Sequence, residues 1–333
     1  MPPVSICVTT YKRAPVLSQT IDSILAQSYG DFELIISDDC SLDDTAEICR
    51  DYERQDRRVK YYCNPTNLKM PGNLNAAIQR AQGDYVANLH DGDVYRPDLI
   101  AKWKAALDAV PTASFVFNAY KVINADGSES ISGEPFDGKA PRYYVAQHHF
   151  RTFTCCVWGT VMARAAAYKK AGGFDPAYGF ISDVDMWLRL AHDSDVAYVA
   201  EPLITVTPRE PDHPFAYHSW QHLFWQFAIY KKHLAFYNDV LPQEVEKYRA
   251  DYANLLRRKF IRAMLSLIKH QKWERVREGL AVWRNAEDNL LKTIGRVLGN
   301  KVALKNWYNE TSWRDILLSE PLNFESRTPA EEQ

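Results

Sequence analysis

The sequence predicts a doubly wound α/β fold, in which a mostly parallel central sheet is flanked by helices. Two observations carry this prediction. Over the first hundred residues, short apolar runs alternate with segments of helical spacing, at a period of roughly thirty residues. The runs are rich in β-branched residues, as in parallel strands buried on both faces. At 333 residues the chain is long enough for one large domain with an appendage, or for two ordinary domains.

The elements follow in order along the chain. The first predicted strands are 4–9, 32–37, 59–63 and 85–89, and the helices between and after them are 16–27, about 45–55, 73–81 and 99–110. An edge strand at 114–122 and an Asp-Gly hairpin turn at 124–128 come next, and 129–150 is interpreted as a mobile loop. Then come a strand at 156–164, a glycine-capped helix end at 169–175, a helix from about Asp183 and a strand at 197–201.

The C-terminal third has a different character, with long helical patterns from residue 220 onward. We therefore predict a first domain over 1–215 and a helical region over 216–333. Within 257–305 Lys and Arg outnumber Asp and Glu, and the basic cluster at 257–262 lies among apolar residues. Such a basic amphipathic helix is typical of a membrane-surface element, but a packed helix with a solvated basic face fits equally well.

Composition limits the class of partner. The hydrophobic fraction of 46% indicates a folded protein, and a net charge of −2 gives no argument for nucleic-acid binding. The six cysteines include no C-x-x-C pair, and the N-terminus lacks the features of a signal peptide. No uncharged apolar run approaches the ~18–20 residues of a membrane span. We expect a cytoplasmic protein, whose contact with the inner face of the membrane would be peripheral; a homo-oligomer is left open.

Polar clusters follow three of the predicted strands, at the point where each strand ends. They are Thr9-Thr10-Tyr11 with Arg13, Asp38-Asp39 with Ser41 and Asp43, and His90-Asp91 with Asp93. One such cluster is explained by turn chemistry, but in this fold class ligands bind beyond the carboxyl ends of the strands. No glycine-rich phosphate loop occurs, so a divalent cation on the carboxylates of the third cluster is the predicted device for binding phosphate.

The order and spacing of these motifs resemble family 2 glycosyltransferases, over residues 4 to about 215. The motifs are TTYKR at 9–13, SDDCSLD at 37–43, Asn67 with Asn73-x-Asn75, and HDGD at 90–93 with Pro97. The resemblance implies a GT-A fold with a C-terminal helical extension. It also implies inverting transfer of a sugar from a nucleotide-diphosphate sugar to a hydroxyl of a glycan, lipid-linked or other cell-envelope acceptor.

The resemblance implies a role for each motif. Asp39 is expected to hydrogen-bond the nucleotide base, Asp93 to coordinate Mn²⁺ or Mg²⁺ on the diphosphate, and Asp91 to contact the ribose or the metal. The other implied nucleotide-binding residues are Thr9, Thr10, Tyr11, Arg13, Asn67 and Asn73. Two positions depart from the pattern: Gly92 interrupts the acidic run, and Lys69 stands where such loops often have glycine. Lys69 is either a phosphate contact or a solvated loop residue.

The segment 181–190 is expected to supply the general base. The family pattern has an acidic pair here whose second member is the base; that position is Asp183, and Ser182 replaces the first member. Inverting transfer needs one carboxylate to take the proton of the acceptor hydroxyl. We favour Asp183 over Asp185, which should point elsewhere on a helix. The alternative for Asp183 is a helix cap without a catalytic role.

Residues near the base are assigned to the donor and acceptor pocket: Trp158, Gly159, Ser182 and Trp187. Burial under the sheet is the alternative for Trp187. His213 is the predicted additional ligand of the metal or diphosphate, with His218 as its substitute. Two alternative functions are a sugar-nucleotide nucleotidyltransferase and a non-catalytic nucleotide-sugar-binding protein. The nucleotidyltransferase would have a glycine-rich basic loop after the first strand, where this chain has TTYKRAP.

Overall fold

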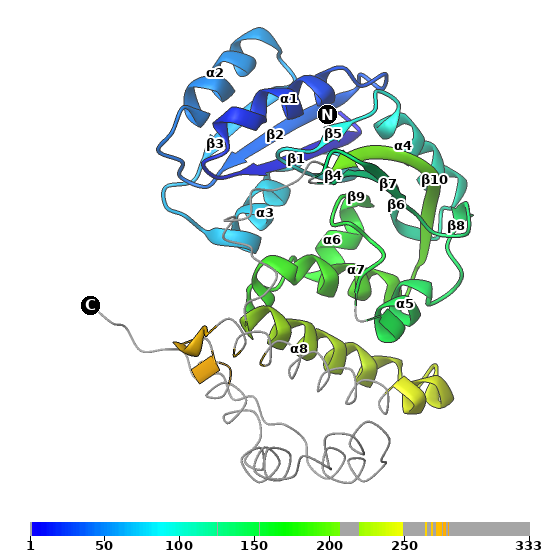
Figure 1. The fold of residues 1–333 in the computed structure, drawn as a ribbon. Coiled ribbons are helices and arrows are strands. Elements are labelled where there is room, and N and C mark those ends of the chain that lie inside the picture. The colour runs from blue at the N-terminus through cyan, green and yellow to red at the C-terminus, as the bar shows by residue number, and fades with distance from the viewer. Residues whose placement is uncertain are drawn as a thin grey trace. The chain divides into compact units, whose positions relative to one another are not determined.

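A ten-stranded sheet with helices on both faces forms the centre of the protein in a computed structural model (Figure 1). The structure describes residues 2–206 apart from 125 and 153, residues 220–248, and a few positions between 264 and 279. The chain divides into two compact units, Met1–Phe236 and Tyr237–Gln333, and the sheet belongs to the first.

The first half of this unit alternates strand and helix as predicted. Its elements are β1 (Val4–Thr10), α1 (Ala14–Leu25), β2 (Phe32–Asp38), α2 (Thr45–Gln55), β3 (Val59–Cys63), α3 (Lys69–Arg80), β4 (Tyr85–His90), β5 (Val94–Tyr95) and α4 (Leu99–Ala109). Strands β3, β2, β1 and β4 lie side by side in that order and are parallel. Their carboxyl ends therefore meet at one edge of the sheet.

The second half extends the sheet with strands of both directions. Its elements are β6 (Ala113–Ile123), β7 (Glu129–Ser132), β8 (Gly138–Lys139), α5 (Tyr144–Thr152), β9 (Val161–Arg164), α6 (Ala165–Ala171), the 3₁₀-helix η1 (Pro176–Ile181), α7 (Ser182–His192), β10 (Asp195–Val206) and α8 (Trp220–Tyr237). Strand β9 is antiparallel to both β4 and β6, whereas β10 is parallel to β6. The antiparallel strand β9 thus joins the two parallel parts of the sheet.

Helices cover both faces of the sheet, which explains why the central strands β1, β2 and β4 are largely apolar and buried. Helices α1, α2 and α4 lie on one face, where Val4, Ile6 and Val8 of β1 pack with Leu17 and Trp103 (Figure 1). Helices α3, α6 and α7 lie on the other. The predicted α/β fold class is confirmed.

Two predictions about the middle of the chain are wrong. Strand β6 is not an edge strand, because it lies between β9 and β10; only its last residues, 120–123, are half-exposed, where the hairpin with β7 extends from the sheet. The segment 129–150 contains β7, β8 and most of α5 rather than an irregular loop. Short polar strands such as β7, whose four residues are all exposed, carry no apolar pattern that the sequence could reveal.

The C-terminal predictions are only partly covered by the structure. Helix α8 is present, close to the predicted 221–233. Across the described part of the chain, no helix combines the length and apolar character that crossing a bilayer requires. The basic cluster at 257–262 and the helices predicted beyond it lie outside the described residues, apart from a few positions.

Candidate active site

Asp39 follows β2 and joins the first two polar clusters. Its backbone N–H donates to the carbonyl of Thr10 at 3.0 Å. Its carboxylate accepts from the backbone N–H of Leu68 at 2.7 Å and of Lys69 at 2.8 Å, and from the side-chain amide of Asn64 at 3.2 Å. A carboxylate has about four acceptor positions, so these three leave little capacity for a base. Asp39 therefore fixes the loop before α3, and the predicted bond to the nucleotide base stays a prediction.

The loop before α3 is shaped by amide side chains. The N–H of Lys69, which has a positive φ of 58°, also donates to Oδ1 of Asn67 at 2.9 Å. Asn73 is 2% exposed; it donates to the carbonyl of Ser37 and accepts from Asn64, both at 2.9 Å. Because both its amide oxygen and its amide nitrogen are hydrogen-bonded inside the protein, Asn73 supports the loop, and its predicted place in the nucleotide site stays a prediction.

The loop after β1 contacts both of its neighbours. The N–H of Lys12 donates to Oγ of Ser41 at 2.8 Å, and the guanidinium of Arg13 lies 3.9 Å from Oδ1 of Asp91. Tyr11 is 41% exposed, so its ring is accessible, whereas Thr10 is buried and Thr9 half-buried. The three polar clusters therefore meet at the carboxyl edge of β1, β2 and β4.

Two features of the structure explain why a glycine interrupts the acidic run at position 92. Its φ is +86°, in the left-handed region that L side chains rarely adopt, and a Cβ would lie 2.6 Å from a guanidinium nitrogen of Arg13. The hydroxyl of Thr20 accepts from the N–H of Gly92 at 2.9 Å and donates to the carbonyl of Asp93 at 3.0 Å. The glycine thus lets Arg13 pass directly over the turn between the two carboxylates.

Asp93 lies at the inner end of this turn and is nearly buried. Its Oδ2 is 3.4 Å from the indole Nε1 of Trp158 and 3.6 Å from Nδ1 of His90. That Nδ1 is buried and has no hydrogen-bond partner. His90 belongs to the third polar cluster, but its place next to Asp91 is the only signal in the sequence for a role.

A divalent cation fits the donor set at Asp93. A carboxylate oxygen with an orphaned imidazole nitrogen beside it offers ligands that Mn²⁺ accepts, and Mg²⁺ would use the carboxylate alone. Among the described residues there is no group of three or more His, Cys, Asp or Glu side chains that could hold a metal by itself. Water and substrate phosphates would therefore complete the coordination, as is usual for Mg²⁺. The predicted ligand His213 and its substitute His218 lie outside the described residues.

Gly159 is the point where this turn meets α7. Its φ is +100°, and a Cβ built there would lie 2.9 Å from Oδ2 of Asp183 and 3.2 Å from Nε2 of His90. The side-chain amide of Asn88, in β4, donates to the carbonyl of Gly159 at 2.8 Å. Only a glycine leaves room for both side chains, so the predicted base and the motif that contains Asp93 flank one backbone position.

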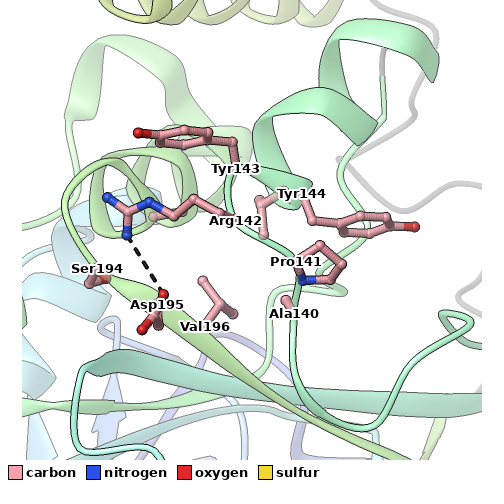
Figure 2. Close-up of a pocket in the computed structure, with 10 residues that line it drawn as sticks. Ala140, Pro141, Arg142, Tyr143, Tyr144, Ser194, Asp195 and Val196 are labelled. Carbon is pink, nitrogen blue, oxygen red and sulfur yellow. Dashed lines mark ion pairs between the residues drawn. The ribbon is translucent and has the colours of Figure 1, made fainter. Parts of the chain in front are cut away.

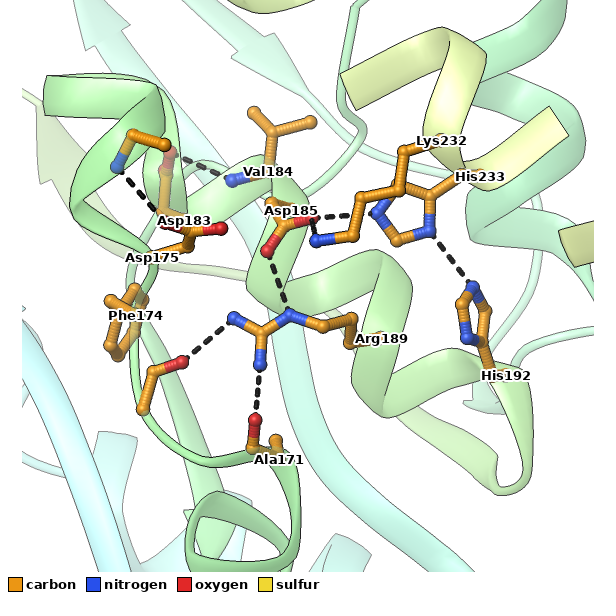
Figure 3. A network of polar contacts seen from close by, with 12 residues as sticks. Ala171, Phe174, Asp175, Asp183, Val184, Asp185, Arg189, His192, Lys232 and His233 are labelled. Carbon is orange, nitrogen blue, oxygen red and sulfur yellow. Dashed lines mark hydrogen bonds and ion pairs between the residues drawn. The ribbon is translucent and has the colours of Figure 1, made fainter. Parts of the chain in front are cut away.

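The two aspartates at the start of α7 have different surroundings (Figure 3). Asp183 is half-buried, and its Oδ1 accepts from the N–H of Val184 at 2.8 Å. Asp185 is fully buried and accepts from Nε of Arg189 at 2.7 Å, Nζ of Lys232 at 2.7 Å and Nε2 of His233 at 2.9 Å. A carboxylate enclosed by three donors cannot reach an acceptor hydroxyl, which favours Asp183 over Asp185 as base.

The pKa shifts around Asp185 agree with its role as a buried, ion-paired carboxylate. Burial alone would raise the pKa of Asp185, but the hydrogen bonds from His233 and Lys232 and the charge of Arg189 hold that pKa well below its usual range. Burial, and then the neighbouring His233, lower the pKa of His192 to about 3; burial also lowers the pKa of His233. Asp185 is thus ionised and both histidines are neutral at neutral pH.

The two predicted tryptophans differ in position. Trp158 is partly buried, and its ring centroid lies 5.2 Å from that of Tyr120. Its indole N–H points toward Asp93. Trp187 is fully buried, with ring centroids 5.7 Å from Phe115 and 5.6 Å from Phe174. Trp187 is therefore a core residue, which favours the alternative of burial under the sheet over a place in the acceptor pocket. Ser182 is also buried.

A shallow pocket elsewhere in the fold does not contain this site. Figure 2 shows it between the start of α5 and the turn from α7 into β10. Asp195 forms ion pairs there with Arg142 at 3.7 Å and Lys139 at 2.8 Å. None of the predicted site residues lines this pocket.

Comparisons with known proteins agree with the geometry. The sequence profile of "Glycosyl transferase family 2" matches residues 5–172. The chain is 30% identical over 206 residues to a putative glycosyltransferase, EpsE, of Bacillus subtilis, covering 59% of this chain and 69% of that protein. It is 38% identical over 94 residues to the GalNAc(5)-diNAcBac-PP-undecaprenol beta-1,3-glucosyltransferase of Campylobacter jejuni, 28% of this chain and 30% of that enzyme.

Solved structures show the same fold. Residues 1–349 of TarS from S. aureus, in complex with UDP-GlcNAc, align with a TM-score of 0.57 at 15% identity, over 85% of this chain and 92% of that one. The mannosyltransferase PcManGT from Pyrobaculum calidifontis, in complex with GDP-Man and Mn²⁺, aligns with a TM-score of 0.51 at 19% identity, over 92% and 83%. The fold is therefore GT-A.

Proposed function

Because this chain belongs to glycosyl transferase family 2, we propose that it transfers a sugar, with inversion, from a nucleotide-diphosphate sugar to a hydroxyl of a cell-envelope glycan or lipid-linked acceptor. One observation carries the proposal. At Gly159 the turn that holds Asp93 and the first turn of α7 flank the same backbone position. Direct displacement at a sugar requires groups that bind the departing diphosphate on one side of the sugar and a carboxylate base on the other.

The carboxyl edge of β1 and β2 is the proposed nucleotide site. The exposed ring of Tyr11 offers a face on which a base can stack. Arg13 and Asp91, 3.9 Å apart, offer a donor and an acceptor for the ribose or the diphosphate. Asp39 and Asn67 fix the neighbouring loop through the N–H of Lys69, so this wall of the site is preorganised.

Asp93, with His90 beside it, would hold the divalent cation. When bound, such a cation stabilises the negative charge that develops on the departing diphosphate. The orphaned Nδ1 of His90, 3.6 Å from Oδ2 of Asp93, is the feature of this chain that supports a metal here. The N–H of Trp158, 3.4 Å from the same oxygen, orients the carboxylate.

Asp183 is the proposed general base. Its carboxylate takes the proton of an acceptor hydroxyl while that oxygen forms a bond to the anomeric carbon. The bond from this carbon to the diphosphate oxygen breaks, and the nucleoside diphosphate leaves with the bonding electrons. Attack from the side opposite the leaving group inverts the configuration. The N–H of Val184 occupies one oxygen of Asp183, and the other lies toward Gly159.

The class of acceptor rests on similarity. The Campylobacter jejuni relative is named for a glycan carried on undecaprenol diphosphate, and the Bacillus subtilis protein TuaG, 33% identical over 127 residues, is named for teichuronic acid biosynthesis. The match spans 50% of TuaG and 30% of the Campylobacter jejuni enzyme. We accordingly propose a cell-envelope acceptor and a site of action at the cytoplasmic face of the membrane.

Thermal stabilisation by nucleotides tests the donor site. We expect one nucleoside diphosphate among UDP, GDP and dTDP, or its nucleotide sugar, to raise the melting temperature more in Mn²⁺ than in EDTA. No stabilisation by any member of this panel would overturn the proposal. Asp183→Asn tests the base: it should keep donor stabilisation and lose at least about 100-fold in transfer, the usual contribution of a general base. Near-wild-type transfer by this variant would place the base elsewhere.

A further inference from the structure

A buried polar network ties α7 to α8 (Figure 3). Two consecutive residues of α8, Lys232 and His233, donate to the same oxygen of Asp185, at 2.7 and 2.9 Å. Arg189, one turn further along α7, donates to the other oxygen at 2.7 Å. The carboxylate is completely enclosed, and every donor that encloses it comes from α7 or α8.

The network continues through a second histidine. Nε2 of His192 lies 2.8 Å from Nδ1 of His233, and the ring of His192 stacks on Phe236 with centroids 3.5 Å apart and an angle of 6°. Because Nε2 of His233 donates to Asp185, a neutral His233 accepts at Nδ1 from the N–H of His192. The chain from Asp185 through His233 to His192 therefore has one consistent set of tautomers.

The same network holds the turn before α7. The two terminal nitrogens of Arg189 donate to the carbonyls of Ala171 at 2.5 Å and Gly173 at 2.7 Å. Asn75, in α3, donates to the carbonyl of Phe174 and accepts from its N–H, both at 2.8 Å. Residues 171–174 are thus fixed by Asn75 of α3 and Arg189 of α7, and the first turn of α7 is fixed from α8 through Asp185.

Asp183 lies on the same helical turn as Asp185, two residues before it. We propose that Lys232 and His233 are positioning residues for sugar transfer, which hold Asp183 against Gly159 through Asp185, so that α8 is part of the catalytic unit. This inference rests on the proposed role of Asp183 as base. A buried carboxylate that loses a donor must regain a partner, by admitting water or by shifting its helix. A displacement of about 1 Å at the reacting groups can cost about 100-fold in rate.

Substitutions in α8 of the full chain test the inference. We expect Lys232→Ala and His233→Leu to lower kcat for UDP-GlcNAc, UDP-glucose or GDP-mannose with Mn²⁺ by about 10- to 100-fold, with donor KM within about twofold. Lys232→Arg and His233→Gln retain a donor toward Asp185 and should restore most of kcat. Lys231→Ala, which removes an equal charge from the neighbouring position of α8, is the matched control.

A second measurement does not depend on the identity of the donor. Hydrogen–deuterium exchange of residues 182–186 should be faster in Lys232→Ala and His233→Leu than in wild type and Lys231→Ala, whereas exchange in α1 should not change. Unchanged exchange at 182–186 in both variants would overturn the inference. A lower melting temperature with wild-type kcat would also overturn it, since the network would then be structural only.

Asp183→Asn in the same series separates the two proposals. If this variant loses transfer while Lys232→Ala keeps it, the base stands and the positioning role fails. If Asp183→Asn turns over like wild type, the base assignment in the proposed function fails, and with it the reason for a positioning role.

Discussion

Gly92→Ala is expected to weaken nucleotide binding through Arg13, beyond what its backbone strain costs. Gly92 and Gly127 have nearly the same φ, +86° and +81°. A Cβ at Gly92 would lie 2.6 Å from the Arg13 guanidinium, whereas a Cβ at Gly127, in the β6–β7 hairpin, would meet nothing within 4 Å. Gly127→Ala is thus a control with the same backbone strain and no steric contact.

Comparing Gly92→Ala with Gly127→Ala separates the loss of stability from the loss of nucleotide affinity. A left-handed conformation costs an L residue about 1–2 kcal/mol, so both variants should lose about that much free energy of unfolding in urea titrations. In Gly92→Ala the Arg13 guanidinium must also shift from its position beside Asp91. A lost hydrogen bond to a charged group is worth about 1.5–3 kcal/mol, which corresponds to a 10- to 150-fold weaker binding of nucleotide.

Isothermal titration with UDP and GDP in Mn²⁺ measures the second effect. We expect Gly92→Ala to bind at least about tenfold more weakly than Gly127→Ala, which should bind like wild type. Equal affinity in the two variants would refute a role for the Arg13 contact, whatever their stabilities.

Three further outcomes are expected. Trp187→Ala should lose about 3–5 kcal/mol of unfolding free energy in urea, as for a buried aromatic. Trp158→Phe removes the N–H on Asp93 and should weaken Mn²⁺-dependent nucleotide binding by up to about tenfold, measured calorimetrically. Because His192 and His233 have lowered pKa values in the folded state, the unfolded chain binds more protons below its histidine pKa of 6.5. The free energy of unfolding should therefore fall as pH decreases below about 6.5. His192 contributes up to about 1.4 kcal/mol per pH unit down to about pH 3, His233 acts in the same direction, and urea titrations at several pH values check this.

Apolar runs and glycine positions in the sequence predicted the strands and helix ends that depend only on neighbouring residues. Strands β1, β2 and β4 each extend only one residue beyond the predicted bounds, because buried parallel strands are largely apolar along their length; the half-exposed end strand β3 also has the predicted bounds. The end of α6 at Gly172, with φ +79°, follows from a glycine cap. Strand β6 was misplaced because no local signal tells that β9 returns to pair with it.

The meeting of the three polar loops at one edge of the sheet was predictable from the order and spacing of the strands and motifs, and the structure confirms it. The roles of their aspartates stay predictions. The burial of Trp187, in contrast, depends on Phe115 and Phe174, which lie far from it in sequence. Lys232 and His233 look like ordinary residues of a polar helix face until α8 is placed beside α7.

Asp183 and Asp185 show why spacing alone does not assign a catalytic residue. Both are acidic residues in the first turn of α7, and either could take a proton in isolation. Their difference comes from other parts of the fold: α8 supplies two donors that enclose Asp185, whereas Oδ2 of Asp183 lies against the position that a Cβ at Gly159 would occupy. An enclosed, ion-paired carboxylate with a lowered pKa is a poor base, because its proton affinity and its access are both reduced. The pairing that makes Asp185 a poor base is, in our proposal, also what holds the helix turn that carries Asp183.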